Sequence, residues 1–322
     1  MVIRIPNWLG DALMATPVYD NLKEVEIITL FGPPSFLTLF EDFPKVETAP
    51  YYKGDFSTNL ATLRKYRRDK GLLLTNSFSS AWLFFRAGLK ERYGYRTDMR
   101  GLLLTKGISP PKEKMHQRDK YLYLVEKLGY NIKSRDLILY LREEKKAKAK
   151  SFLGRYLTPE KDNFVILAPG AAFGPAKRWP EPFFKDLAKR LNQEGFKVFI
   201  IGGPQEEKMG SFIAEGLNHT HNLCGKTELS LLAGLLTHAK LLISNDSGLM
   251  HLAAALRIPQ IAIFGSTDPE LTGPLNPRAR ILRIPLPCAP CFRRRCPKGH
   301  YRCLTEIKPQ VVFGEAIELL QK

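Results

Sequence analysis

The sequence predicts an α/β protein made of two doubly wound domains, each with a parallel sheet covered by helices on both faces. Short, nearly continuous apolar runs alternate with helical patterns, as expected of strands buried within a parallel sheet. This alternation occurs twice, and a highly charged segment at residues 143–162 separates the two halves. The chain has 322 residues, a length that suits two hydrophobic cores better than one.

The first half alternates strand and helix patterns from its first residues onward. Pro17 is expected to kink or delay the first helix, and Gly71 is expected to close the third. Residues 94–114 are loop-rich and basic. The predicted strands cover residues 2–5, 25–30, 45–50 and 72–77, and the predicted helices cover residues 11–23, 34–43, 59–71 and 116–130.

The second half repeats the alternation more clearly. We interpret the charged segment as a linker helix, which gives domains at residues 1–150 and 151–322, and the final helix could pack back on the first domain. Ligands of open α/β sheets bind outside the carboxyl ends of the strands, so we expect the chemistry in a cleft lined by these loops. The predicted strands cover residues 164–170, 196–203, 240–246 and 259–265, and the predicted helices cover residues 181–195, 205–217, 228–239, 248–257 and 311–321.

The composition indicates a soluble protein with an anionic partner. Lys and Arg number 49 against 32 Asp and Glu, which leaves a net charge of +17. Such an excess favours nucleic acid, an anionic membrane surface or a phosphorylated ligand. The first residues lack the pattern of a signal peptide, and no apolar run reaches about 18 residues, so we expect a cytoplasmic location. No GxGxxG follows the first strand and no GxxxxGK[ST] occurs, which argues against nicotinamide dehydrogenases and P-loop NTPases.

Five cysteines are present, and four of them are close together in the sequence. Cys224 stands alone, whereas Cys288, Cys291, Cys296 and Cys303 follow the spacing Cys-x2-Cys-x4-Cys-x6-Cys. Four thiolates could form a tetrahedral metal site, but the second pair lacks the usual Cys-x2-Cys spacing. A bound metal, disulfides and free thiols all remain open.

The loop after the first strand carries one carboxylate, Asp11. An acid at a helix N-terminus is favoured by the helix dipole and stays ionised. It would repel a phosphate, so we expect phosphates to bind elsewhere and Asp11 to be available as a proton acceptor. The alternative is a helix cap, which is the commoner use of Asp at such a position.

The loops of the second half carry cations and helix N-termini instead. A Gly- and Ala-rich loop at residues 169–180 delivers Lys177 just before a helix, and Lys can bind a phosphate as a point charge. Asp246, Ser247 and Gly248 end a strand and begin a helix that carries His251, and the amides of its first turn can bind an anion. Solvated loop cations, an N-cap and a buried histidine are the plainer alternatives.

Together, these two loops predict a site for a nucleotide diphosphate. Two further loops extend it with less support, because Lys226 and Thr227 precede a helix and Glu206 follows a strand, where an acid could hold ribose hydroxyls.

Seven segments together carry a resemblance to a known family. The chain resembles the inverting ADP-heptose:lipopolysaccharide heptosyltransferases, type II, in family order over nearly its whole length. Each segment alone is modest support, and the set is highly specific. The segments are NWLGDALMATP, NSFSSAW, GYRTDMRGLLLT, PGAAFGPAKRWP, SNDSGLMHLAAAL, FGSTDPELTGP and the cysteine stretch PCAPCFRRRCPKGHYRC.

The resemblance implies a GT-B architecture, in which two Rossmann-like domains face each other across a cleft. It implies transfer of L-glycero-D-manno-heptose from ADP-heptose to the lipopolysaccharide inner core, with inversion and without a metal or other cofactor. Asp11 matches the family's catalytic aspartate, and Lys177 matches its donor-phosphate lysine. The donor site would also include Asp246, Ser247, Gly248 and His251, with the backbone of Ala171 and Ala172 replacing the hydroxyl residues of type I enzymes.

The resemblance also implies a membrane-bound acceptor, heptosyl-Kdo2-lipid A. Its phosphates and carboxylates, and the anionic inner-membrane surface, would attract a basic enzyme that is peripheral to that membrane and binds no nucleic acid. The candidate acceptor-binding residues are Arg64, Lys65, Arg67, Arg68, Arg96, Arg100 and Arg118. The alternatives are heptosyltransferase I or another GT-B sugar transferase and, more distantly, a sugar-nucleotide epimerase or a nucleic-acid-binding protein.

Overall fold

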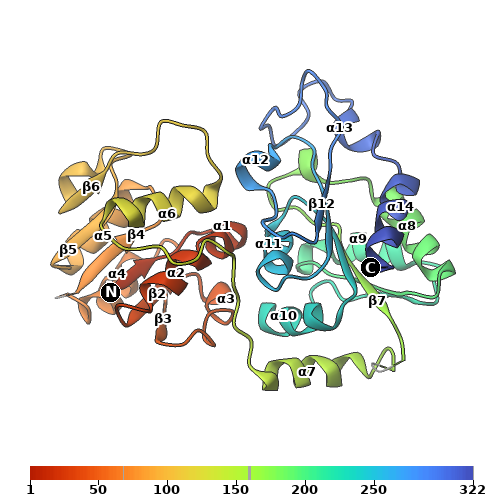
Figure 1. The fold of residues 1–322 in the computed structure, drawn as a ribbon, viewed down its shortest axis with the longest axis horizontal. Helices are drawn as coiled ribbons and strands as arrows, with labels where there is room; N and C mark the ends of the chain where they lie inside the picture. Colours follow the sequence, from red (N-terminus) through yellow and green to blue (C-terminus); the bar gives the residue numbers. More distant parts are fainter. Residues whose placement is uncertain (68, 159–160, 322) are drawn as a thin grey trace. The chain divides into compact units, whose positions relative to one another are not determined.

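The computed structural model describes residues 1–67, 69–158 and 161–321. The chain divides into two compact units, Met1–Tyr140 and Leu141–Lys322. Each unit contains, within the described residues, a six-stranded sheet in which neighbouring strands run parallel (Figure 1). The prediction of two doubly wound α/β folds is confirmed, although the units divide before the predicted boundary at residue 150.

The boundary differs because the charged segment is packed rather than exposed on all sides. Helix α7 (Glu143–Leu153) buries one face against α10 (Leu229–His238). Gly234 permits this close approach, since a Cβ there would stand 2.8 Å from the Ala149 Cβ. The helix therefore belongs to the second unit.

Unit 1 has the strand order β3-β2-β1-β4-β5-β6. Helix α4 packs beside α5, and α6 packs beside α1 and α2 (Figure 1). Its strands are β1 Val2–Arg4, β2 Ile28–Gly32, β3 Val46–Pro50, β4 Lys70–Leu73, β5 Glu91–Tyr95 and β6 Lys106–Ile108. Its helices are α1 Leu9–Met14, α2 Thr16–Leu22, α3 Pro34–Leu37, α4 Phe56–Arg64, α5 Phe78–Ala87 and α6 Gln117–Lys127, with a 3₁₀ turn η1 at Arg100–Leu103.

The first predicted helix is interrupted, as Pro17 indicated. It divides at Ala15 into α1 and α2, and Pro17 occupies the first turn of α2, where its missing N–H costs nothing. The Thr16 hydroxyl donates to the Leu13 carbonyl at 2.7 Å and satisfies one of the acceptors at the end of α1.

The predicted role of Gly71 is wrong. Helix α4 ends at Arg64, and Gly71 lies inside strand β4. A Cβ at Gly71 would stand 2.6 Å from side-chain atoms of Phe84 and Leu89. The glycine is thus required by the close packing of α5 against the sheet, rather than by a helix end.

Unit 2 has the order β12-β11-β10-β7-β8-β9, which is the same order as unit 1 when its strands are numbered from β7. Its strands are β7 Phe164–Ala168, β8 Lys197–Ile200, β9 Thr220–Asn222, β10 Leu241–Asn245, β11 Gln260–Ile263 and β12 Ala279–Leu282. Its other elements are α8 Glu181–Gln193, α9 Glu207–Ala214, α11 Gly248–Ala255, α12 Pro269–Thr272, α13 Arg302–Thr305, α14 Pro309–Leu320, η2 Pro175–Lys177 and η3 Pro204–Glu206.

The shared order places a topological switch point in each unit. The chain leaves β1 and β4 in opposite directions across the first sheet, and it leaves β7 and β10 likewise across the second. Loops that follow these strands diverge and leave room for a ligand at the carboxyl edge.

The final helix packs on the core of unit 2. Helix α14 lies against α8, β10 and β11, and its Val312 and Ala316 are part of the same hydrophobic core as Trp179 and Phe184. Among the described residues, we find no helix long and apolar enough to cross a membrane.

We predict that Gly71→Ala lowers the free energy of unfolding by about 1–3 kcal/mol, because the added methyl group overpacks a buried contact with Phe84 and Leu89. Thermal or denaturant unfolding measures the change. Gly314→Ala is the matched control, since no described atom lies within 4 Å of its Cβ position in α14. The control should be neutral or more stable by roughly 0.5–1 kcal/mol. Equal effects of both substitutions would contradict the packing argument.

Candidate active site

Asp11 lies just beyond the carboxyl end of β1, in the first turn of α1. The helix begins at Leu9, and the N-cap residue is Trp8, so Asp11 is not the capping residue. The phenol of Tyr121, from α6, donates a hydrogen bond to Asp11 Oδ1 at 3.4 Å. The carboxylate therefore lies at the switch point of unit 1, with its position supported from a second helix.

A buried cation orders the loop that leads to Asp11. Arg4, the last residue of β1, is fully buried, and its guanidinium lies 3.6 Å from the centroid of the Tyr51 ring. It also donates to Asn7 Oδ1 at 2.5 Å, which fixes the loop between β1 and α1. Burial lowers the pKa of Arg4 to about 10, so the side chain remains protonated at neutral pH.

Two buried phenols also belong to the surroundings of Asp11. Burial raises the pKa of Tyr121 well above its ordinary value, and the negative charge of Asp11 raises it further. Burial likewise raises the pKa of Tyr19, while Arg4 opposes and Asp11 adds to the shift. Both phenols therefore stay protonated, and Tyr121 acts as a hydrogen-bond donor. Neither tyrosine was predicted from the sequence, because both look like ordinary core residues of a helix.

Lys177 and Asp246, predicted on separate loops, form an ion pair in unit 2. Lys177 Nζ lies 2.5 Å from Asp246 Oδ2, and both side chains are largely buried. The hydroxyl of Thr267 donates to the same carboxylate. These three residues follow β7, β10 and β11, which are neighbours in the sheet. The pair orients Lys177 at the carboxyl edge, and the carboxylate of Asp246 is contacted from two sides.

The loop that carries Lys177 is fixed at both ends by one side chain. Asn245, the last residue of β10, donates to the Pro169 carbonyl at 2.7 Å and accepts from the Trp179 amide at 3.0 Å. Trp179 is fully buried, and its indole donates to the Ile307 carbonyl at 2.8 Å. We had not predicted a role for Asn245 or Trp179, although both stand inside segments that carry the resemblance.

A second cation joins Lys177 beside the ring of Phe173. Lys177 Nζ lies 4.9 Å from the ring centroid, and the Arg294 guanidinium lies 5.6 Å from it. The carbonyl of Arg294 accepts a hydrogen bond from the Ala176 amide at 3.1 Å. Gly174 permits this contact, because a Cβ there would stand 2.7 Å from the Arg294 carbonyl oxygen. The cysteine-rich loop therefore supplies a cation to the Lys177 loop.

The start of α11 adds backbone donors to the same edge. Ser247 is the N-cap of the helix, and its hydroxyl has no hydrogen-bond partner among the described residues. Gly248 is the first helical residue, and His251 is buried within the first turn. The orphan amides and the Ser247 hydroxyl form a group of donors of the kind that binds an oxyanion.

The remaining residues predicted to line the nucleotide diphosphate site follow β7, β8 and β9. Ala171 is buried and its carbonyl accepts from Arg178 Nε at 3.3 Å, whereas Ala172 is exposed. Glu206 is buried and accepts from the Gly203 amide at 2.6 Å, so its observed contact shapes the loop after β8. Lys226 is exposed and donates to the Asn222 carbonyl at 3.0 Å, and Thr227 follows it. All these residues lie at the carboxyl edge of the second sheet.

The basic residues that were predicted to bind the acceptor substrate differ in their exposure to solvent. Arg64, Lys65, Arg67 and Arg96 are exposed, and Arg68 lies outside the described residues. Arg118 is engaged locally, because Nε and Nη2 each donate to Asp119 at 3.0 Å.

The prediction that Arg100 binds the acceptor is wrong. This residue is completely buried. Its guanidinium donates to the carbonyls of Tyr95 and Thr75 and to Asn76 Oδ1, and so joins the loops that follow β4 and β5. Burial lowers the pKa of Arg100 to about 10. The arginine is a structural cation, and replacing it would disturb the loops rather than remove a surface charge.

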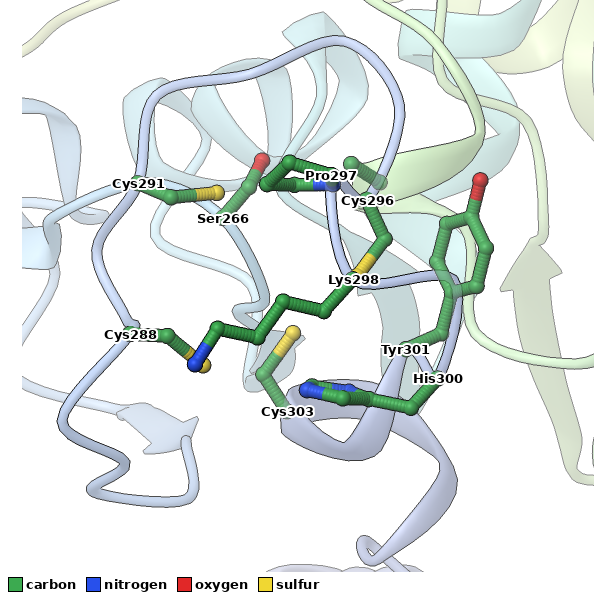
Figure 2. A pocket seen from close by; sticks show the side chains of 10 residues that line it. Ser266, Cys288, Cys291, Cys296, Pro297, Lys298, His300, Tyr301 and Cys303 are labelled. Atoms are coloured by element: carbon green, nitrogen blue, oxygen red, sulfur yellow. The ribbon is translucent and has the colours of Figure 1, made fainter.

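The four clustered cysteines meet around one pocket, together with Ser266, Lys298 and His300. Figure 2 shows their sulfur atoms directed toward its interior, with the Lys298 side chain extending across it. All five cysteines of the described chain are free thiols. Within residues 1–67, 69–158 and 161–321, no three His, Cys, Asp or Glu side chains are grouped so as to hold a metal ion.

The sheets and the placed loops can now be compared with known proteins. Residues 59–302 match the family model described as glycosyltransferase family 9 (heptosyltransferase). The chain belongs to this family. It is therefore a glycosyltransferase, and the predictions of family, enzyme class and fold class are confirmed. The chain is 32% identical to lipopolysaccharide heptosyltransferase 2 of Escherichia coli K12, over 98% of this chain and 97% of that protein.

The solved structure of ADP-heptose lps heptosyltransferase II from E. coli is similar throughout. Its TM-score is 0.85 at 30% identity, and the match covers 99% of this chain and 98% of that chain. By contrast, lipopolysaccharide heptosyltransferase 1 of Pseudomonas aeruginosa is 35% identical over only 37% of this chain and 34% of that protein. Similarity to the type 2 enzyme thus extends over both units.

We predict that the thiols of this chain differ in reactivity in a fixed order. Backbone amides, that of Tyr301 first, lower the pKa of Cys296, whereas burial raises the pKa of Cys224 to about 12. A lowered pKa increases the thiolate fraction at neutral pH, so Cys296 should be alkylated by iodoacetamide much faster than Cys224. Mass spectrometry of the labelled peptides measures both rates in one sample. Labelling of Cys224 before Cys296 would contradict the prediction.

Proposed function

We propose that this glycosyltransferase transfers L-glycero-D-manno-heptose from ADP-heptose to the lipopolysaccharide inner core, as the second heptose, onto heptosyl-Kdo2-lipid A. The observation that carries the proposal is the full-length similarity to heptosyltransferase 2, compared with partial similarity to heptosyltransferase 1. The family match favours a transferase over a sugar-nucleotide epimerase. Addition of the first heptose is the second candidate, because part of the chain does match a type 1 enzyme.

Unit 2 is proposed to bind ADP-heptose. The diphosphate would meet Lys177 Nζ, the neighbouring Arg294 and the first amides of α11, with Ser247 as a further donor. Thr267 would hold Asp246 in place when Lys177 turns toward the phosphate. The adenosine and heptose would contact the rest of the carboxyl edge, for which the candidates are Ala171, Ala172, Glu206, Lys226, Thr227, Gly248 and His251.

Asp11 is proposed as the general base. Its carboxylate takes the proton from the acceptor hydroxyl, the hydroxyl oxygen forms a bond to the anomeric carbon, and the bond to the diphosphate breaks. Attack from the side opposite ADP inverts the anomeric centre, by analogy with inverting hydrolases. Lys177 and the α11 amides stabilise the charge on the leaving diphosphate, so the proposed transfer needs no cofactor from the protein.

The acceptor and the membrane are proposed partners of unit 1. The exposed cations Arg64, Arg67 and Arg96 are available to the phosphates of the acceptor, and Arg118 is available if it exchanges part of its pairing with Asp119. We propose a cytoplasmic enzyme that is peripheral to the inner membrane and does not use its net charge of +17 to bind nucleic acid.

We predict that Asp11→Asn abolishes most heptose transfer while ADP-heptose still binds. Loss of a general base costs roughly 10²–10⁴-fold in turnover, whereas the donor contacts lie in unit 2. Release of ADP in the presence of acceptor measures turnover of wild type and variant, and calorimetry measures donor binding.

Asp20→Asn is the control for the Asp11 substitution. Asp20 lies on α2 and pairs with Lys23 at 2.7 Å, so its loss should leave turnover near that of wild type. Near-normal transfer by Asp11→Asn would exclude the base assignment, and absence of transfer by the wild type would exclude the proposed substrates.

A further inference from the structure

Two apolar side chains project from unit 1 almost completely into solvent. Met99 is 91% exposed and Leu102 is 96% exposed, and they flank the start of η1. Within the same turn, Leu103 packs against the core of the unit and Leu104 is buried in it. The side chain of Leu102 therefore points outward, whereas those of Leu103 and Leu104 point inward.

A buried framework, rather than a loose loop, holds these two side chains outward. Arg100, between them, is completely buried and donates to the Tyr95 carbonyl at 2.9 Å. The carboxylate of Asp98 accepts from the Phe78 amide at 2.6 Å. Asp98 and Met99 both adopt left-handed backbone angles, with φ of 49° and 56°, which cost energy in residues other than glycine. Met99 is therefore held in its exposed position by a strained backbone.

Beside this turn, α5 carries a stripe of aromatic rings. Phe78, Trp82 and Phe85 follow helical spacing, and the Trp82 ring stacks with both phenylalanines at centroid distances of 6.5 and 5.7 Å. Phe78 is 44% exposed and Phe85 is 45% exposed. The Asp98 contact joins Phe78 to the residue before Met99, so the stripe and the two projecting side chains form one surface.

Arginines lie beside two rings of this stripe and beside the neighbouring turn. The guanidinium of Arg86 lies 5.4 Å from the Trp82 ring, and that of Arg92 lies 5.4 Å from the Phe85 ring. Arg92 also donates to the Leu103 carbonyl at 2.6 Å, which links the far end of the stripe to η1. Arg96 runs beside Gly101, with its Cγ 3.9 Å from the Cβ position. Apolar side chains, aromatic rings and cations therefore occur together.

We propose that this α5–η1 surface, defined by Phe78, Trp82, Phe85, Met99 and Leu102, docks on an anionic lipid bilayer. The apolar side chains enter the boundary between headgroups and acyl chains, and Arg86, Arg92 and Arg96 bind the lipid phosphates. Tryptophan and its neighbouring arginines suit this depth, where one end of a side chain is apolar and the other hydrated. The inference deepens the proposed function, since it locates the surface through which a lipid-linked acceptor is reached.

Charge favours a bilayer over a second copy of the chain as the occupant. A symmetric dimer through this face would bring the arginines of both copies together. An anionic bilayer instead attracts them, along with the net charge of +17 on the whole chain.

The test is flotation with vesicles that contain no acceptor. Wild-type enzyme should float with vesicles of phosphatidylethanolamine and phosphatidylglycerol and much less with phosphatidylcholine alone. The double variant Met99→Gln, Leu102→Gln should bind the anionic vesicles about tenfold more weakly, because two apolar side chains no longer enter the bilayer. The double variant Ile27→Gln, Val311→Gln is the control, since these residues are also exposed, by 67% and 53%, but lie elsewhere.

Transfer to a water-soluble, deacylated acceptor separates docking from catalysis. The Met99, Leu102 variant should match the wild type in this assay, and loss of turnover would assign the surface to sugar binding and overturn the proposal. Equal vesicle binding by this variant and the control, or a concentration-dependent dimer that the variant abolishes, would also overturn it. Vesicle binding without any heptose transfer by the wild type would refute the proposed function and leave the docking surface supported.

Discussion

The reversal of strand order beside the first strand of each sheet is the constraint on which the candidate sites depend. A parallel sheet requires crossover helices, and the chain can cover both faces only by turning one way after β1 or β7 and the other way after β4 or β10. The loops that follow these strands must diverge. Asp11 follows β1, and Lys177 and Asp246 follow β7 and β10, so these three candidates occupy the gaps that the topology creates.

Buried polar side chains then fix the loops at those gaps. Arg4, Arg100 and Asn245 each bond to the loops that leave the strands, and each is nearly or fully buried. A buried arginine is stabilised by the oxygen atoms that accept from its guanidinium, because an unpaired charge in the interior is very costly. The carbonyl groups that accept from Arg100 are thereby held in one arrangement.

The sequence predicted the strands that are buried on both faces, together with the edge strand β3, but not β5, β6, β9 or β12. Runs such as 164–170 and 259–265 are almost continuously apolar because helices cover both sides. Strand β12, ARIL, lies at the edge of its sheet, and its partly exposed side chains give no such signal. Helix α5 was not predicted for a different reason. Its outer surface carries exposed aromatic rings, so its apolar residues are not confined to the face that packs on the core.

The candidate site was predictable in its loops and not in its contacts. Lys177 and Asp246 could be placed at the carboxyl edge because they follow apolar strands. Their ion pair, with Lys177 Nζ 2.5 Å from Asp246 Oδ2, could not be predicted from the sequence. Arg100 shows the same limit of sequence-based prediction. The sequence does not distinguish a buried arginine from an exposed one, and only the fold places the carbonyls of Tyr95 and Thr75 around this side chain. Arg294 comes from a loop far along the chain, and only the fold brings it to Phe173.

The most direct measurement is heptose transfer from ADP-heptose to Kdo2-lipid A that already bears one heptose, compared with Kdo2-lipid A that bears none. We expect turnover on the heptosylated acceptor alone, because the similarity to heptosyltransferase 2 extends over 98% of the chain. Turnover on the bare acceptor alone would contradict this account and make the chain an enzyme of first-heptose addition.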